Sequence, residues 1–218
     1  MEKHEVIGLD FFHEDLFQLS LNKRDITHEI GDCLTLFNSD GTGRPYSISS
    51  SPEEDHLRFL IRRQPGGAVS DWLAQKGLGE TIKTSRPYGW FRPGDSTLAQ
   101  TKQIFFATGT GIAPFLAYFS QGNPSIETDL FYGCRKAEDL VLPPAEKINQ
   151  SFIAISQEKK TRYHSGRITD LLEKVEISSD IHYYLCGLDL MIDEISEFLE
   201  NRGISFMNIH REVFFHGK

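Results

Sequence analysis

Cysteine and long apolar runs are both scarce in this chain of 218 residues. Its 3 cysteines, Cys33, Cys134 and Cys186, lie far apart, so the sequence suggests neither a disulfide framework nor a cysteine-based metal site. No segment approaches the roughly 18 consecutive apolar residues that a membrane-spanning helix needs. The N-terminal segment MEKHEVIGLD has no apolar core of a secretory signal, so we expect a cytoplasmic protein with free thiols.

Basic residues are also fewer than acidic residues. The 23 Lys and Arg residues against 31 Asp and Glu give a formal net charge of −8, which argues against a nucleic-acid partner. The 8 histidines are scattered without the spacing of a metal site, and we therefore predict no bound metal. What the chain does have is 39% hydrophobic residues, mixed with charged residues along its length, which is enough to bury a sizeable core.

The first half of the chain consists of short strand-like runs separated by turn residues. These runs are Val6–Leu9, Leu16–Leu21, Cys33–Phe37, Tyr46–Ser49, Leu57–Arg62 and Thr81–Thr84. Together they predict a six-stranded antiparallel Greek-key barrel. A short helix is expected between the fifth and sixth strands at residues 70–75, with Ser70 as its N-cap and Gly77 as its stop.

The second half alternates apolar strands with amphipathic helices. The strands are Ile104–Ala107, Leu130–Tyr132, Phe152–Ile155, Tyr183–Cys186 and Ile209–Phe214. This alternation predicts a doubly wound parallel five-stranded sheet. Helices are expected at Ile168–Val175 and around Ile192–Leu199, where apolar residues recur at helical spacing. We predict two domains, a β-barrel at residues 1–97 and an α/β domain at residues 98–218.

The glycine turn after the strand at Ile104–Ala107 is a candidate anion site. The segment Thr108-Gly109-Thr110-Gly111 joins a buried strand to an apolar, helix-like stretch. Glycines allow the backbone to approach a phosphate closely, and the first N–H groups of a helix can donate to it. We therefore predict a nucleotide cofactor held by its pyrophosphate, with a strand–turn–helix unit that binds nothing as the alternative.

A second candidate anion site lies in the first half. Arg44, Tyr46 and Ser47 bring a cation, a flat aromatic ring and a hydroxyl together at the start of a strand. Some twenty residues later, the segment at residues 66–70, GGAVS, leads into the short helix and forms a possible backbone anion nest. The alternative is an ordinary β-turn followed by a helix cap. Both motifs in this order, ahead of the second glycine turn, favour binding.

In these motifs the chain resembles the ferredoxin–NADP reductase family of flavoproteins. The matching motifs are RPYS at 44–47, GGAVS at 66–70, PYGWF at 87–91, ATGTGIAPF at 107–115, YGCR at 132–135, YLCG at 184–187 with Met191, and REVFF at 211–215. The resemblance implies that the barrel holds a flavin, usually FAD, and that the second domain holds NAD(P). Hydride would pass between nicotinamide and flavin, and electrons would then leave to a protein acceptor such as ferredoxin or flavodoxin.

The resemblance also implies roles for individual residues. On the flavin side, Arg44 would bind the pyrophosphate, Tyr46 would border the isoalloxazine and Ser47 would hydrogen-bond near N5. Further pyrophosphate donors would be Gly67, Ala68, Val69 and Ser70. On the coenzyme side, the dinucleotide would be received by Thr108, Gly109, Thr110, Gly111 and Arg135, with Cys186 and Gly187 beside the nicotinamide. Glu212 and Phe214 would be the family's C-terminal carboxylate and flavin-covering aromatic ring, with Phe215 as the alternative ring. Ser47, Cys186 and Glu212 would be the catalytic residues.

Three questions stay open at this level. The first is the coenzyme: NADPH is expected, because Lys159, Lys160 and Arg162 could bind its 2′-phosphate. NADH is the alternative, because the resemblance places Gln157 where NADP-specific relatives tend to carry Arg. The acceptor is the second question, since a diaphorase-like reductase of small molecules and a non-catalytic nucleotide-sensing subunit are alternatives. The third is oligomeric state. The 3 cysteines are too few for the four ligands of a two-iron iron–sulfur cluster, so we expect a flavin reductase alone.

Overall fold

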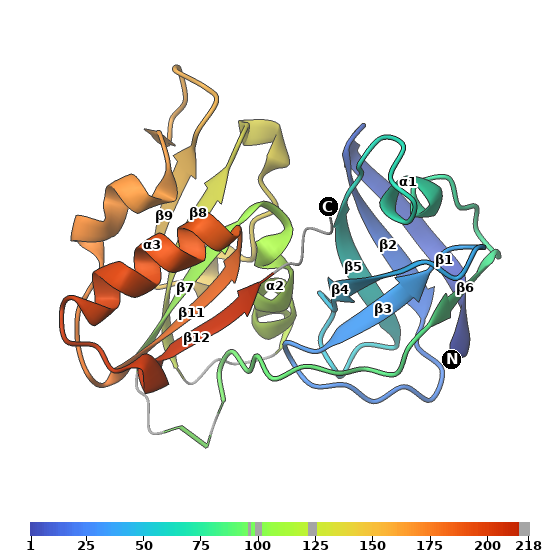
Figure 1. The fold of residues 1–218 in the computed structure, drawn as a ribbon, viewed down its shortest axis with the longest axis horizontal. Helices are drawn as coiled ribbons and strands as arrows, with labels where there is room; N and C mark the ends of the chain where they lie inside the picture. The colour runs from blue at the N-terminus through green and yellow to red at the C-terminus, as the bar shows by residue number, and fades with distance from the viewer. Residues whose placement is uncertain (96, 99–101, 122–125, 214–218) are drawn as a thin grey trace. The chain divides into compact units, whose positions relative to one another are not determined.

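The computed structural model describes residues 1–95, 97–98, 102–121 and 126–213. Over the described residues the chain forms two compact units (Figure 1). The first unit comprises Met1–Arg92 and Ala113–Gln121, and the second comprises Pro93–Ile112 and Gly122–Lys218.

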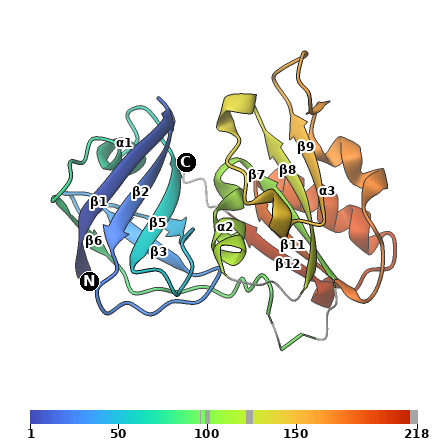
Figure 2. The ribbon, with the colours of Figure 1, turned by 180° about the vertical axis from the view of Figure 1, so that it is seen from behind.

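The first unit contains one antiparallel sheet of six strands in the order β4-β3-β6-β1-β2-β5. The strands are β1 (Glu2–His13), β2 (Leu16–Asn22), β3 (Cys33–Phe37), β4 (Gly43–Ser47), β5 (His56–Arg62) and β6 (Thr81–Thr84). Figure 2 shows β1, β2 and β5 side by side. Just beyond β4, Ser49 donates its N–H to the carbonyl oxygen of Arg58 on β5 at 2.8 Å, which closes the sheet. The predicted six-stranded antiparallel barrel is therefore confirmed.

Apolar alternation explains the core of this barrel. Phe17, Leu19 and Leu21 on β2 are fully buried, and they lie opposite Ile61, Phe59 and Leu57 on β5, which are also fully buried. Because alternate residues of a strand face the same side, these six side chains form one inward surface. Each fully buried side chain of this kind contributes about 1.5–3 kcal/mol.

The second unit contains a parallel sheet in the order β10-β9-β8-β7-β11-β12. The strands are β7 (Lys102–Thr108), β8 (Glu127–Cys134), β9 (Gln150–Ile155), β10 (His164–Ser165), β11 (Ile181–Gly187) and β12 (Ile209–Val213). Five of them are the predicted strands, with longer bounds for most. The sixth, β10, was not predicted, because two residues are too few to show a periodic pattern.

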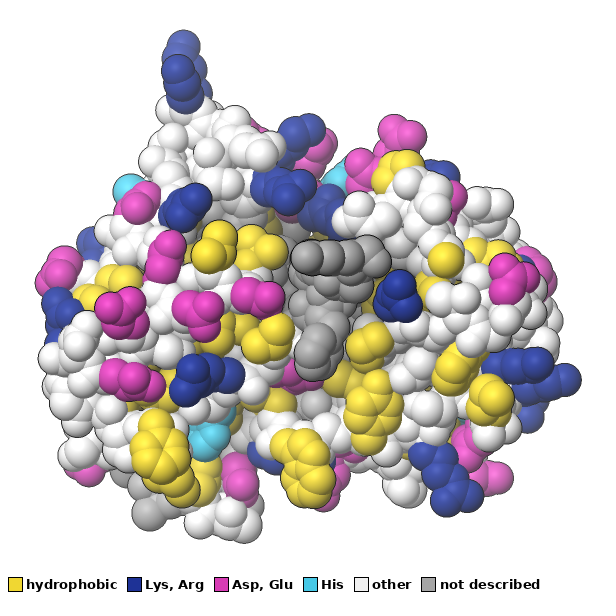
Figure 3. Space-filling model, in the orientation of Figure 1, with side chains coloured by type: hydrophobic (Ala, Val, Ile, Leu, Met, Phe, Trp, Pro, Cys, Tyr) yellow, Lys and Arg dark blue, Asp and Glu magenta, His cyan; other side chains and the backbone are white. Residues whose placement is uncertain are grey.

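The helical elements of the chain are short, and α3 (Asp189–Glu200) packs on the sheet of the second unit. The helical elements of the chain are α1 (Ser70–Leu73), η1 (Gly109–Ile112), α2 (Ala113–Ser120), η2 (Ala137–Asp139), η3 (Ala145–Lys147), η4 (Ile168–Lys174), α3 (Asp189–Glu200) and η5 (Phe206–Asn208). Buried Ile192, Ile195 and Leu199 of α3 share one apolar core with the strands and with η4. In Figure 1, α3 lies over β11 and β12. Its outward face is acidic, as the magenta side chains over this helix in Figure 3 show.

Two helix predictions need correction. The stretch at Ile168–Lys174 is a 3-10 helix rather than an α-helix, and Arg167 before it is extended, with its N–H donated to the Asp170 carboxylate at 2.8 Å. The helix α1 is shorter than predicted, and its N-cap is Val69 rather than Ser70. The Ser70 hydroxyl instead accepts the N–H of Gln64 at 3.0 Å, because the loop turns back on itself before the helix begins. Over the described residues, no helix has both the length and the apolar character needed to cross a bilayer.

Candidate functional site

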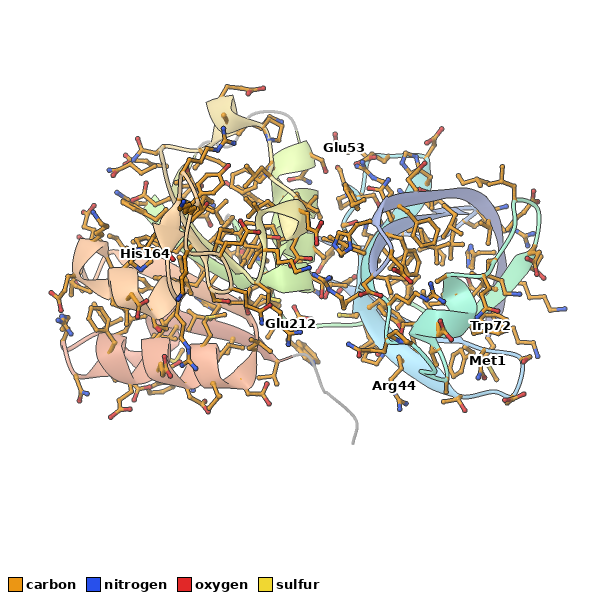
Figure 4. All side chains as sticks on the ribbon, turned by 90° about the horizontal axis from the view of Figure 1, so that it is seen from above. Met1, Arg44, Glu53, Trp72, His164 and Glu212 are labelled. Atoms are coloured by element: carbon orange, nitrogen blue, oxygen red, sulfur yellow. The ribbon has the colours of Figure 1, made fainter. Side chains whose placement is uncertain are left out.

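The first candidate site begins on β4, the strand at one edge of the antiparallel sheet. Arg44 is exposed, and its guanidinium donates to the carbonyl of Gly43 at 3.0 Å and forms no ion pair with any described residue. Figure 4 shows this side chain projecting away from the barrel ribbon. Tyr46 is partly buried, and burial raises the pKa of its phenol to about 12, against a smaller opposing effect of Arg44. Its ring is therefore neutral at physiological pH.

Ser47 faces the opposite side of β4 from Arg44 and Tyr46. It is 3% exposed and lies directly across the hairpin from Cys33, with 3.5 Å between Ser47 Oγ and Cys33 Sγ. The β-hairpin therefore presents a cation and an aromatic ring on one face and a buried hydroxyl–thiol pair on the other.

The loop before α1 has the features of an anion nest, although only part of its donor set is available. Gly66 has a φ of +73°, and a β-carbon there would meet nothing within 4 Å. The N–H of Gly67 is used in a turn to the carbonyl of Gln64 at 2.8 Å. The N–H groups of Ala68 and Val69 donate to no other residue in the described ranges. These two N–H groups are the donors that the loop can offer an anion.

Asn38, which the sequence motifs did not single out, ties this loop to the β3–β4 hairpin. Its side-chain oxygen accepts the N–H groups of Asp40 at 3.0 Å and Thr42 at 2.9 Å, which fixes the hairpin turn. Its amide nitrogen donates to the carbonyl of Ala68 at 2.8 Å. The structure thereby holds the loop of Gly66 against the hairpin of Arg44. An unpaired cation, open glycine backbone and unused N–H groups fit the pyrophosphate of a dinucleotide such as FAD.

The second candidate site is the turn after β7, where the predicted strand–glycine–helix order is present. Gly109 begins the 3-10 helix η1 with a φ of +53°, and a β-carbon on it would meet nothing within 4 Å. The first N–H groups of a helix have no carbonyl within that helix to bind. Thr110 and the open backbone of Gly109 therefore fit a phosphate in the same way as the first site.

The other glycines here serve close backbone packing. A β-carbon on Gly111 would lie 2.3 Å from the carbonyl oxygen of Cys186, and one on Gly187 would lie 2.1 Å from Thr108 Oγ1. The same Thr108 hydroxyl accepts the N–H of Leu188 at 2.9 Å. The ends of β7 and β11 are thus joined backbone to backbone, which brings Thr108, Gly111, Cys186 and Gly187 together.

Cys186 and Glu212 are neighbours in the parallel sheet. Cys186 is fully buried and is paired in register with Ala107 on β7 and with Glu212 on β12. Glu212, labelled in Figure 4, is partly buried. Phe214 and Phe215, the two predicted flavin-covering rings, lie outside the described residues. The three cysteines of the chain are buried, and none of them forms a disulfide with another described residue.

A pocket in the second unit lies among the loops that follow β8 and β9. Its volume is about 610 Å³. Its lining residues are Ala137, Leu140, Leu142, Glu158, Lys160, Thr161, Arg162 and Tyr163. Glu158 accepts the N–H of Ala137 at 2.8 Å and so joins the two loops. Lys160 has no ion-pair partner among the described residues, whereas Arg135, at the end of β8, is exposed and does not line the pocket. Leu140, Leu142 and Tyr163 supply an apolar wall that no sequence motif indicated.

Comparison with known proteins matches the chain to two family models. A family model described as the oxidoreductase FAD-binding domain matches residues 3–92, and one described as the oxidoreductase NAD-binding domain matches residues 105–197. The toluate 1,2-dioxygenase electron transfer component of Pseudomonas putida is 31% identical over 191 residues, which cover 81% of this chain and 55% of that protein. The chain thus spans little more than half the length of the first of its curated relatives.

Two further likenesses cover nearly whole proteins. The ferredoxin–NADP reductase of Azotobacter vinelandii is 24% identical over 91% of this chain and 89% of its own length. A ferredoxin NADP+ reductase of Neisseria gonorrhoeae, solved with bound FAD and NADP, has a TM-score of 0.87 at 18% identity, with 98% of each chain covered, and so shares the fold. From its two matched domains and this fold, the chain belongs to the ferredoxin–NADP reductase-like family of oxidoreductases, which join an FAD-binding domain to an NAD-binding domain.

Proposed function

We propose that this protein is an FAD-dependent NAD(P)H reductase that passes electrons to a protein acceptor such as ferredoxin or flavodoxin. The observation that carries the proposal is the position of two open glycine turns, Gly66 shortly before α1 in the first unit and Gly109 at the start of η1 in the second. Each has a positive φ and free space at the β-carbon position, so a phosphate can approach the backbone ahead of each helix. We assign residues 1–97 to the FAD-binding domain and residues 98–218 to the NAD(P)-binding domain.

The flavin-binding residues follow from the first site. Arg44 binds the FAD pyrophosphate through a charge-assisted, forked contact, and the N–H groups of Ala68 and Val69 donate to the same group. Gly67 and Ser70 shape this loop, since their N–H and hydroxyl groups bind Gln64. Tyr46 borders the isoalloxazine as a neutral ring, and Ser47 offers its hydroxyl near N5. The bound flavin would take a hydride from reduced nicotinamide and release electrons singly.

The coenzyme-binding residues follow from the second site. Gly109 and Thr110 receive the pyrophosphate of NAD(P), while Thr108, Gly111 and Gly187 hold the turn in shape by close packing. Arg135 offers a second cation to a coenzyme phosphate. Cys186 borders the nicotinamide, and Glu212 supplies the carboxylate beside it. Because hydride transfer needs little acid–base chemistry, these residues act by orienting the ring and excluding water.

We infer that NADPH is the preferred coenzyme. A 2′-phosphate needs cations, and Lys160 and Arg162 both line the pocket beyond β8 and β9. The carboxylate of Glu158 lines the same pocket, and it accepts the N–H of Ala137. The two cations outnumber this one carboxylate, which supports a phosphate, rather than a bare ribose hydroxyl, as the group that the pocket receives.

The partner and location are part of this proposal. The curated relatives are named as electron transfer components of dioxygenases and as ferredoxin reductases. We infer a small one-electron carrier protein as the acceptor here, and a cytoplasmic location in keeping with three buried cysteines that form no disulfide among the described residues.

Anaerobic stopped-flow reduction, with NADPH and NADH compared side by side, tests the whole proposal. The expected result is a yellow protein whose flavin absorbance bleaches, faster with NADPH at equal concentration. A colourless protein that takes up neither FAD nor FMN would contradict it. Rapid reduction of ferricyanide without turnover of any ferredoxin or flavodoxin would instead identify a small-molecule reductase. Nucleotide binding without flavin reduction would identify a sensing subunit.

A further inference from the structure

A buried tyrosine reaches the coenzyme turn from the neighbouring strand. Tyr132 lies on β8 and is fully buried. Its hydroxyl donates to the carbonyl oxygen of Gly109 at 3.1 Å, and the carbonyl oxygen of Asp139 lies 3.5 Å away. Burial raises the pKa of this phenol well above its usual value, so it remains a donor at every physiological pH.

The contact with Gly109 controls the direction of an N–H group. The peptide unit is planar and trans, so the carbonyl of Gly109 and the N–H of Thr110 point in opposite directions from the same rigid plane. A hydroxyl that holds the Gly109 carbonyl therefore aims the Thr110 N–H away from Tyr132. Gly109 has no side chain and a φ of +53°, so without this hydrogen bond the peptide plane has unusual freedom to rotate.

The contact with Asp139 connects the same hydroxyl to the pocket. Asp139 ends η2, and its carboxylate accepts the N–H of Lys136 at 3.2 Å, which holds this short turn together. Ala137 and Leu140, which are within two positions of Asp139 in the sequence, line the 610 Å³ pocket. The hydroxyl of Tyr132 thus lies between the turn of Gly109 and the loop that forms one wall of the pocket.

We propose that Tyr132 is a positioning residue for the coenzyme: its hydroxyl fixes the Thr110 N–H towards the pyrophosphate and holds the pocket wall at a set distance from that turn. This inference rests on the proposed function, since the ligand is the NAD(P) of that function. Tyr132 touches no part of the ligand itself. Its contribution is preorganisation, because a turn already in its binding conformation loses less entropy when the phosphate arrives.

The second unit offers a matched control. Tyr183 on β11 is also fully buried, and its hydroxyl donates to the carbonyl oxygen of Glu176 at 2.9 Å. Tyr132→Phe and Tyr183→Phe each keep the ring and remove a hydroxyl that donates to a backbone carbonyl oxygen. The Tyr183 hydroxyl also accepts the N–H of Ser178 at 3.1 Å, so Tyr183→Phe should lower stability at least as much as Tyr132→Phe does. Only Tyr132 contacts the glycine turn.

The test measures binding of NADP+ and NAD+ to the full chain, as purified, by calorimetry. Tyr132→Phe should bind the preferred nucleotide roughly fivefold to tenfold more weakly than the wild type, the range expected for one neutral hydrogen bond. Tyr183→Phe should bind it as the wild type does. FAD content should be the same in all three proteins. Hydrogen exchange should be faster in the segments 109–112 and 137–142 of Tyr132→Phe alone.

The outcomes separate the two proposals. A wild type that binds neither nucleotide would overturn the proposed function, and with it the role of Tyr132. A wild type that binds one of them, with Tyr132→Phe unchanged in affinity or weakened no more than Tyr183→Phe, would overturn only the role of Tyr132. Weaker binding by Tyr132→Phe together with faster exchange confined to those two segments would support it.

Discussion

Gly111 and Cys186 meet backbone to backbone in the second unit. A β-carbon on Gly111 would lie 2.3 Å from the carbonyl oxygen of Cys186 and 2.7 Å from its carbonyl carbon. Neither is the end of a flexible side chain. Cys186 is paired on both sides, with Ala107 and with Glu212, so its backbone cannot retreat without disturbing two ladders of the sheet.

We therefore predict that Gly111→Ala lowers the free energy of unfolding by about 1–3 kcal/mol, the usual range for overpacking. It should also weaken nucleotide binding, since the turn that includes Gly109 must shift. Chemical denaturation and calorimetry measure the two effects. Gly77→Ala is the control: its β-carbon would meet only the end of the Glu80 side chain at 3.4 Å, an ordinary contact. Equal stability of the two variants would contradict the prediction.

Arg44→Ala should loosen flavin binding. Removal of one charge-assisted contact of about 1.5–3 kcal/mol corresponds to at least a roughly tenfold weaker affinity for FAD. The measurement is the FAD-to-protein ratio after gel filtration, followed by titration of the apoprotein. Arg86→Ala is the matched control, because Arg86 is also an exposed arginine of the first unit, with Glu2 3.8 Å away. Full flavin content in Arg44→Ala would remove Arg44 from the site.

Cys186→Ala should slow reduction of the flavin by NADPH more than it weakens folding. The thiol is fully buried, so its loss also leaves a small cavity at the strand end. Stopped-flow rates and unfolding free energies should therefore be compared with those of Ile195→Val, which removes one buried methyl group from α3. An unchanged rate of reduction in Cys186→Ala would leave this thiol a packing role only.

Lys160→Ala should raise the KM for NADPH by about tenfold and leave that for NADH nearly unchanged, because only NADPH has the 2′-phosphate that the cation binds. The effect should shrink as salt concentration rises, since the pocket is open to solvent. Steady-state kinetics at two ionic strengths provide the measurement. Lys174→Ala removes the same charge from η4, at a residue that does not line the pocket, and should alter neither KM.

The free energy of unfolding should decrease as the pH is lowered, because of a histidine pair on β11 and β12. His182 Nδ1 and His210 Nε2 are 2.8 Å apart, and the His210 ring stacks on Tyr184. Burial first, and His182 second, lower the pKa of His210 from 6.5 to about 4, with Asp95 opposing them. Burial likewise lowers the pKa of His182.

The sign follows from linkage. Between pH 6.5 and pH 4 the unfolded chain binds a proton at His210 that the folded chain does not, so the free energy of unfolding decreases as pH falls through this window. His210→Phe keeps a ring against Tyr184 and removes the titration. Its unfolding free energy should therefore depend less steeply on pH in the same window, as urea denaturation at each pH can measure. Parallel profiles for both proteins would contradict this assignment.

Most of the fold could be predicted because its strands carry strong local patterns. The bounds of β3 and β6 agree with the prediction to the residue. The position of β4 was less accurate: it runs over Gly43–Ser47 rather than 46–49, because Gly43 and Arg44 pair with Phe37 and Leu36 across the hairpin. The start of β4 is set by this pairing with β3, and the residues GRPYS show no apolar alternation from which it could have been predicted.

The glycine turns could also be predicted from a local pattern, but the residues that hold these turns in place could not. A Gly-Thr-Gly or Gly-Gly sequence is a local signal of unusual backbone conformation. The role of Tyr132 depends on a hydrogen bond to a residue 23 positions earlier, and that of Asn38 on one 30 positions later. Neither contact can be read from the sequence, although the motif YGCR at residues 132–135 includes Tyr132.

The junction of Thr108 with Gly187 and Leu188 has a consequence for redesign. Gly187 has a φ of +141° and no room for a side chain beside the Thr108 hydroxyl, which itself accepts the Leu188 N–H. A change in one of these two segments, which are 80 positions apart in the sequence, therefore requires a matching change in the other. Libraries that aim to exchange NADPH for NADH should vary the pocket loop that follows β9 and keep Thr108 and Gly187 fixed, or else mutate the two positions only as a pair.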